Sequence, residues 1–249
     1  VIAFEPFYDS YAACIAMAGA IRRPVTLPAP TFAVDLDAVA AAVNPRTRLI
    51  LLNTPHNPTG HVFTREELEG IARIAVEHDL IVVADEVYEH LVYDGVHIPI
   101  ATLPGMRDRT VTISSGGKTF SFTGWKIGWT CASPALTTAV RTAKQFLTYV
   151  NGAPFQHAIA VGLRLSDSYY ESFQADMAAK RDRLCAGLAD AGLTVLRPQG
   201  TYFATVDIRS VAGADADGER FCRELPHKCG VVAIPSAVFY DNKDAGRSL

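Results

Sequence analysis

Short uninterrupted apolar runs alternate with segments of helical periodicity along the first half of the chain. The apolar runs cover residues 1–4, 49–52, 80–84 and 110–113. A strand is continuously apolar, rather than alternating, when helices cover both faces of its sheet. Helices are expected after Asp35 and after Thr64, where Thr64 and Glu67 form a capping box. Buried strands that alternate with helices predict an α/β fold with a mainly parallel sheet.

The pattern changes after about residue 134. Helices are expected over residues 134–149, 154–165, 169–191 and 218–229, and short strands over 194–196 and 202–206. A further apolar run covers residues 230–234. The sequence therefore predicts two domains. The large α/β domain covers residues 1–167, and a smaller α+β domain covers residues 168–249.

Composition excludes several functional classes. The 249 residues are 49% hydrophobic and 20% charged, with a net charge of −3, so neither a basic surface for nucleic acid nor one for anionic membranes is expected. No apolar run approaches the roughly 18–20 residues that cross a bilayer. Five scattered cysteines without a C-x-x-C pair favour reduced thiols and a cytoplasmic protein. The seven histidines show no metal-ligand spacing, so no metal site is expected.

Both ends of the sequence have the character of a domain interior. Val1 already stands in an apolar run, and Leu249 follows a loop-like stretch over residues 240–246. We therefore expect a fragment of a longer protein.

Polar residues follow three of the expected strands, where ligands of parallel sheets collect. These segments are residues 53–60, 85–88 and 114–119. Each also has a purely structural interpretation, since residues 57–60 form a turn by their own chemistry and Asp85 is a possible helix cap. The Gly-Lys-Thr sequence at 117–119 suggests a nucleotide phosphate loop. That motif requires glycine where Thr112 stands inside the strand, so it is rejected.

Residues 114–129, SSGGKTFSFTGWKIGW, resemble the cofactor-lysine segment of fold-type-I aminotransferases, which depend on pyridoxal phosphate (PLP). The similarity is strongest to the branch of kynurenine/glutamine and succinyldiaminopimelate transaminases. Four further family motifs occur in the family's order, namely EPFY at 5–8, NPTG at 57–60, DEVY at 85–88 and PQGTYF at 198–203. The resemblance covers essentially the whole chain. It implies the PLP-transferase large domain with part of a C-terminal small domain.

The resemblance implies a catalytic role for three residues. Lys118 matches the lysine that forms the Schiff base (aldimine) with PLP and then moves a proton at the substrate α-carbon. Asp85 matches the carboxylate that keeps the pyridine nitrogen protonated, which makes the ring an electron sink. Tyr88 matches a donor to the phenolic oxygen of the cofactor.

Four more residues match cofactor contacts of the family. Asn57 corresponds to a second donor to the phenolic oxygen, and Tyr8 to the aromatic ring that stacks on the pyridine. Ser115 and Lys126 correspond to phosphate ligands. Many relatives carry arginine in place of Lys126, so a point charge replaces a bidentate contact there.

The resemblance implies an aminotransferase that moves an amino group between an amino acid and a 2-oxo acid by a ping-pong mechanism. It also implies a homodimer. A PLP-dependent C–S β-lyase and a non-catalytic, ligand-sensing domain of a regulator remain alternatives. The family's glycine-rich phosphate loop and the arginine that binds the substrate carboxylate find no match here, so the stretch alone is expected to bind PLP or to transaminate poorly. The sequence does not identify the substrates.

Overall fold

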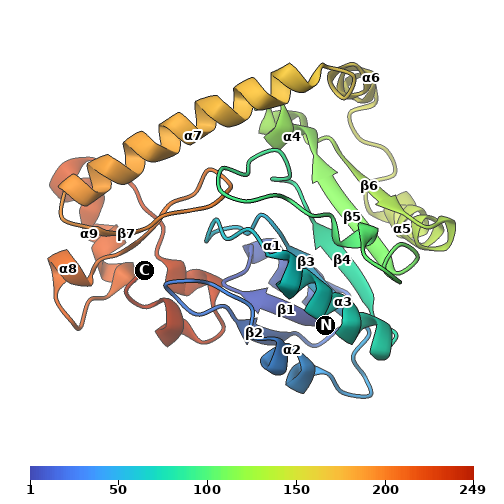
Figure 1. The fold of residues 1–249 in the computed structure, drawn as a ribbon, viewed down its shortest axis with the longest axis horizontal. Coiled ribbons are helices and arrows are strands. Elements are labelled where there is room, and N and C mark those ends of the chain that lie inside the picture. The colour runs from blue at the N-terminus through green and yellow to red at the C-terminus, as the bar shows by residue number, and fades with distance from the viewer.

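A six-stranded sheet forms the centre of the computed structural model, which describes residues 1–249 (Figure 1). The strand order is β2-β1-β3-β4-β5-β6, and all neighbours are parallel except β5 and β6. The strands are β1 (Ile2–Glu5), β2 (Arg23–Thr26), β3 (Leu49–Asn53), β4 (Ile81–Asp85), β5 (Thr110–Ser115) and β6 (Gly128–Ala132). Strands β7 (Thr194–Leu196) and β8 (Thr205–Asp207) form a separate antiparallel pair. The mainly parallel α/β fold is therefore confirmed.

Nine α-helices accompany the strands. They are α1 (Asp9–Met17), α2 (Leu36–Ala42), α3 (Arg65–Glu77), α4 (Gly116–Thr119), α5 (Pro134–Leu147), α6 (Ala153–Gly162), α7 (Asp167–Asp190), α8 (Arg209–Ala212) and α9 (Gly218–Cys229). Four 3₁₀ turns cover Ile100–Thr102, Thr123–Trp125, Ser236–Phe239 and Lys243–Gly246. In Figure 1 the long helix α7 runs along one side of the molecule, from α6 to the C-terminal part. None of the helices is both long and apolar enough to span a bilayer.

The core lies between the sheet and the helices that pack on it. It contains 21 buried residues, among them Ile50 and Leu52 of β3 and Leu68 and Ile71 of α3, all with no exposed surface. Helix α3 begins where the sequence predicts, because the Glu67 N–H donates to Thr64 Oγ1 and the Thr64 N–H donates to Glu67 Oε2. Two otherwise unpaired N–H groups are satisfied in this way.

Several expected elements differ in the structure. The apolar run at residues 230–234 forms no regular element, and Val232 and Ile234 are 79% and 67% exposed. An apolar run becomes a strand only beside a partner that accepts its hydrogen bonds, and no strand pairs with this run. The strand expected over residues 202–206 begins only at Thr205. Strands β2 and β6 and helix α1 were not expected, because their short or mixed sequences lack a clear period.

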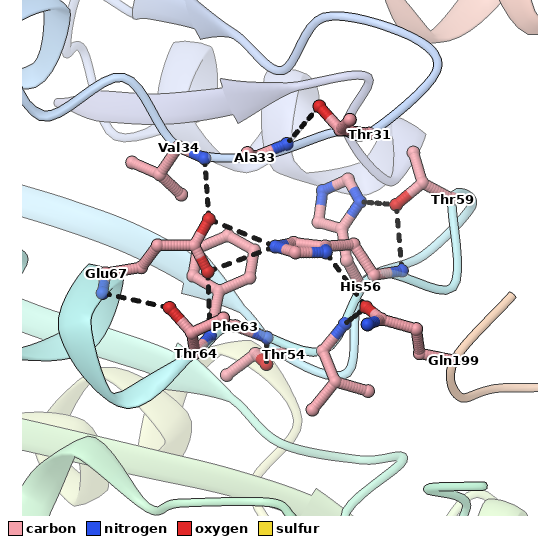
Figure 2. A network of polar contacts seen from close by, with 12 residues as sticks. Thr31, Ala33, Val34, Thr54, His56, Thr59, Phe63, Thr64, Glu67 and Gln199 are labelled. Carbon is pink, nitrogen blue, oxygen red and sulfur yellow. Dashed lines mark hydrogen bonds and ion pairs between the residues drawn. The ribbon is translucent and has the colours of Figure 1, made fainter. Parts of the chain in front are cut away.

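A buried polar network joins the loop before α3 to the segment that leads into β8 (Figure 2). His61 Nε2 lies 3.1 Å from both carboxylate oxygens of Glu67, and His61 Nδ1 lies 3.0 Å from Gln199 Oε1. The Val62 N–H also donates to Gln199 Oε1, at 3.1 Å, which identifies that atom as the acceptor oxygen. Both ring nitrogens of His61 therefore lie at hydrogen-bond distance from acceptor oxygens.

The same two segments are held together by their backbones. The N–H groups of Gln199 and Gly200 both donate to the carbonyl of Gly60, at 3.0 and 2.9 Å. Gly60 has φ +73°, and a Cβ at this position would lie 2.2 Å from Cβ of Pro198. Only glycine fits both the conformation and the close approach. The loop with Asn57 and the segment with Tyr202 therefore form one rigid unit.

We predict that Glu67→Ala lowers the free energy of unfolding by about 3 kcal/mol, because it leaves His61 and the Val34 N–H without their buried acceptor. Burial opposes the charge on Glu67, but bonds from His61, Val34 and Thr64 outweigh it and lower its pKa. The stabilisation from this lowered pKa is therefore complete above the ordinary glutamate pKa and is lost as the pH falls through the lowered value.

Urea unfolding at pH 7 and at a series of acidic pH values measures both effects. Glu66→Ala is the matched control, since Glu66 is exposed in the same helical turn. Equal losses for the two variants at pH 7 would contradict the role assigned to the network.

Candidate active site

The register of three parallel strands gathers polar groups at one edge of the sheet. Asn53 of β3 pairs with Asp85 of β4, and Asp85 pairs with Ile113 of β5. Strand β5 ends at Ser115, and helix α4 follows it directly with Lys118 in its single turn. Ser115 caps this turn, because its Oγ accepts a hydrogen bond from the Gly117 N–H at 3.2 Å. The three segments that the sequence singles out therefore meet at the carboxyl ends of adjacent strands.

The amine of Lys118 lies beside a pair of tyrosine rings. Its Nζ donates to Tyr202 Oη at 2.7 Å and lies 5.7 and 5.4 Å from the ring centroids of Tyr88 and Tyr202. The two rings meet edge to face, 5.2 Å apart, and the Tyr88 hydroxyl donates to Tyr202 Oη at 3.4 Å. Burial raises the pKa of Tyr88, so its phenol keeps its proton and acts as a donor.

The carboxylate of Asp85 is held in a fixed orientation. Tyr11 Oη donates to Oδ2 at 2.5 Å, and the Val87 N–H donates to Oδ1 at 3.3 Å. Burial raises the pKa of Asp85, while these two hydrogen bonds and the charge of Lys118 oppose that rise. The carboxylate and the amine lie at the same edge of the sheet, at the ends of the neighbouring strands β4 and β5.

Tyr8 and Asn57 border this centre without contacting Lys118. Tyr8 immediately precedes α1 and remains 44% exposed, and its ring packs edge-on against Tyr11 at 5.6 Å. The backbone N–H of Asn57 donates to Asn53 Oδ1 at 2.7 Å, and Asn53 Nδ2 donates to the Asp85 carbonyl at 2.9 Å. Asn57 also lines a mostly apolar cavity of about 340 Å³. Tyr8 is thus linked to Asp85 through Tyr11, and Asn57 is linked to it through Asn53.

The side chain of Lys126 lies at the surface of the protein. This residue has a left-handed backbone (φ 55°), and its carbonyl accepts a hydrogen bond from Asn151 Nδ2 at 2.8 Å. Pairing of Gly128 with Ser115 keeps its backbone near the end of β5. The structure therefore brings Lys118, Asp85 and Tyr88 to one edge of the sheet, and Ser115 lies there at the start of α4. The ammonium of Lys126 has no hydrogen-bond or ion-pair partner in the chain.

Sequence reasoning missed two tyrosines of the centre. Tyr11 stands three residues after Tyr8, so both lie on one side of the start of α1. This three-residue spacing could have indicated that Tyr11 lies next to Tyr8. Tyr202 belongs to the PQGTYF motif, but its contact with Lys118 joins residues 84 positions apart and has no local signature.

A group of metal-ligating side chains was also missed. Glu86, Glu89 and His97 offer ligand atoms within 4.8 Å of one another. His97 Nε2 bonds to Glu86 Oε2 at 3.0 Å, and Ser114 Oγ donates to Glu89 Oε1 at 2.6 Å. Glu86 follows Asp85 directly, so alternation along the chain directs it away from the lysine centre. Linear spacing could not reveal this group, because an ordered loop returns His97 to the end of β4.

The fold and this centre define an α/β protein with a lysine amine and a half-buried carboxylate at the carboxyl edge of its sheet. The family model described as aminotransferase class I and II matches residues 1–247. The chain therefore belongs to the class I and II aminotransferases, as the sequence motifs indicate. This family depends on pyridoxal phosphate.

Similar proteins of known name or structure carry related descriptions. A probable N-succinyldiaminopimelate aminotransferase of Mycobacterium tuberculosis is 50% identical over 244 residues, which are 97% of this chain and 61% of that protein. The methionine aminotransferase of Escherichia coli is 38% identical over 96% of this chain and 62% of its own length. The solved structure of the mycobacterial N-succinyldiaminopimelate aminotransferase aligns with a TM-score of 0.95 and 49% identity, over 99% of this chain and 65% of that one. The chain thus spans less than two thirds of these relatives.

The side chains at the centre fit the chemical groups of PLP. An amine is available for the aldehyde, a buried carboxylate for the pyridine nitrogen and a protonated phenol for the phenolate oxygen. A hydroxyl at Ser115 and a free ammonium at Lys126 are suitable for a phosphate. The donor set is therefore the one that this cofactor needs.

We predict that Tyr11→Phe raises the pKa of Asp85 further, because it removes a hydrogen bond to the ionised carboxylate and leaves the effect of burial in place. A carbon-13 NMR titration of the Asp85 carboxyl group in the cofactor-free chain measures this pKa. Tyr8→Phe is the control, since Tyr8 packs on Tyr11 without bonding to Asp85. An unchanged or lower pKa in Tyr11→Phe would show that Tyr11 does not stabilise the charge.

Proposed function

We propose that this chain acts as a PLP-dependent aminotransferase, which moves an amino group from an amino acid to a 2-oxo acid in two half-reactions. The observation that carries the proposal is the Lys118 amine, which donates to Tyr202 at 2.7 Å and follows β5 at the edge of the sheet where β4 ends in the half-buried Asp85. Family membership supports the same conclusion. The chain spans 61% of the named mycobacterial relative. The activity that we propose is that of these 249 residues and is to be tested on them.

Three residues do the chemistry in this proposal. Lys118 Nζ holds the cofactor through its aldehyde and, once released as the free amine, takes the proton from the substrate α-carbon. The carboxylate of Asp85 holds a proton on the pyridine nitrogen. The phenol of Tyr88 donates to the neighbouring phenolic oxygen. When bound, the cofactor supplies an electron sink for the charge that develops at the α-carbon.

The remaining proposed contacts orient the cofactor. Tyr8, at the start of α1, covers one face of the ring, and Asn57 adds a second donor to the phenolic oxygen. Ser115 and Lys126 bind the phosphate at its other end. The free ammonium of Lys126 supports this role, because it has no partner in the chain that competes for it.

Two features support finer proposals about substrates and assembly. The 50% identity to a probable N-succinyldiaminopimelate aminotransferase makes that amino acid the first substrate to test. A homodimer is supported by the apolar residues exposed at the end of α5 and just beyond it, where Phe146, Leu147 and Tyr149 are 87%, 75% and 71% exposed. No residue of α5 is buried within the chain. Sedimentation equilibrium that gives the mass of a single 26.9 kDa chain at micromolar concentration would contradict the homodimer.

We also propose a domain boundary and a cellular compartment. We place the boundary at residues 167/168 because α7 begins at Asp167 and leads from α6 to the separate β7–β8 pair. The five free cysteines support a reducing compartment such as the cytoplasm.

We predict that PLP added to the chain becomes covalently attached to Lys118, and that Lys118→Ala abolishes both the long-wavelength absorbance of the attached cofactor and any transfer of amino groups. The physical reason is that only an amine forms this bond with an aldehyde. Absorbance titration and mass spectrometry after borohydride reduction measure the attachment.

Lys180→Ala is the matched control, since Lys180 is 65% exposed on α7 and pairs with Asp176. Attachment to another lysine, or equal attachment in Lys118→Ala, would reject the proposal. Pyruvate formed from cysteine conjugates without an oxo acid would instead favour β-elimination.

A further inference from the structure

Tyr202 is the direct neighbour of the Lys118 amine, although it comes from the segment that leads into β8. Its phenolic oxygen accepts hydrogen bonds from Lys118 Nζ at 2.7 Å and from the Tyr88 hydroxyl at 3.4 Å. Both contacts use its lone pairs, so the oxygen acts as an acceptor toward the amine. The ring is edge-on to Tyr88 and contacts Phe203 at 4.8 Å between centroids.

The backbone that carries Tyr202 is anchored to the large sheet domain. The Thr201 N–H donates to the Leu91 carbonyl at 2.8 Å, and Tyr93 Oη donates to the Thr201 carbonyl at 2.5 Å. A Cβ on Gly200 would lie 2.7 Å from the Leu91 carbonyl oxygen, so this approach requires glycine. Tyr202 therefore meets Lys118 from a rigid position.

A phenol suits a lysine that must alternate between two states. A carboxylate at hydrogen-bond distance would stabilise the ammonium form strongly, and the ammonium form cannot attack an aldehyde. The neutral oxygen of Tyr202 accepts a hydrogen bond from the amine without adding a negative charge. Nζ becomes more positive as it attacks, so this hydrogen bond strengthens in the transition state.

We propose that Tyr202 is a positioning residue that holds the free Lys118 amine where it forms and re-forms its bond to the cofactor. The inference rests on the proposed function. In the forward step Nζ attacks the aldehyde carbon, a C=N bond replaces the C=O bond, and the oxygen leaves as water after proton transfer from the amine. In exchange with a second amine, the C=N bond passes to that amine and Lys118 returns to Tyr202 as a free amine.

Stopped-flow absorbance tests this proposal on the full 249-residue chain. Tyr202→Phe is expected to slow the attachment of PLP, and its exchange with a small primary amine, by about tenfold, the factor that one ordinary hydrogen bond supplies. The extent of attachment at equilibrium should not fall, because the lost bond stabilises the free amine and the transition state and not the attached form. The melting temperature should stay nearly unchanged. A purely structural role would lower the equilibrium extent or the melting temperature instead.

Two further variants separate the oxygen from the ring and from the backbone anchor. Tyr202→Met removes the ring as well, and it should slow attachment to the same degree as Tyr202→Phe if the oxygen is what matters. Tyr93→Phe loosens the same segment without touching Lys118, and it should react at the rate of the unsubstituted chain.

Three results would overturn the proposal: an unchanged rate in Tyr202→Phe, slowing in Tyr202→Met alone, or equal slowing in Tyr93→Phe. Failure of the unsubstituted chain to attach PLP at all would contradict the proposed function and remove the basis of this inference. Normal attachment with an unchanged rate in Tyr202→Phe would contradict the inference alone.

Discussion

The in-register ends of three parallel strands are the constraint on which the site depends. The strands β3, β4 and β5 end at the same edge of the sheet. Their backbones alone therefore make neighbours of Asn53, Asp85 and the turn that begins at Ser115. The buried residues of β3 and β4 fix this register, since a shift by one residue would turn their apolar side chains to the opposite face. Packing in the core therefore determines the geometry of a polar site that lies outside it.

Tyrosines organise the polar groups at that edge. Tyr11 orients the Asp85 carboxylate, while Tyr202 accepts the hydrogen bond of the Lys118 amine. Tyr202 in turn depends on a segment fastened to the Gly60 carbonyl and to the buried pair of His61 and Glu67. Stability and site geometry are thus coupled through the junction between the 57–61 loop and the 198–202 segment.

The sequence predicted what local chemistry and strand order determine. The capping box of α3, the parallel sheet and the meeting of residues 53–60, 85–88 and 114–119 all followed from patterns within a few residues. Contacts between distant segments could not be predicted in this way, and the bond between Lys118 and Tyr202 is the clearest case. Edge strand β6 was missed because its largely exposed residues carry little apolar signal. The roles of Lys118, Asp85 and Tyr88 in the chemistry stay predictions, as do the cofactor contacts of Asn57, Ser115, Lys126 and Tyr8.

The central claim is that the amine and the carboxylate at this edge hold the two ends of one cofactor ring. A crystal structure of the chain grown with PLP tests it most directly. We expect continuous electron density from Lys118 Nζ to the cofactor and a pyridine nitrogen within hydrogen-bond distance of Asp85. A cofactor bound elsewhere, or a ring whose nitrogen faces away from Asp85, would contradict the account.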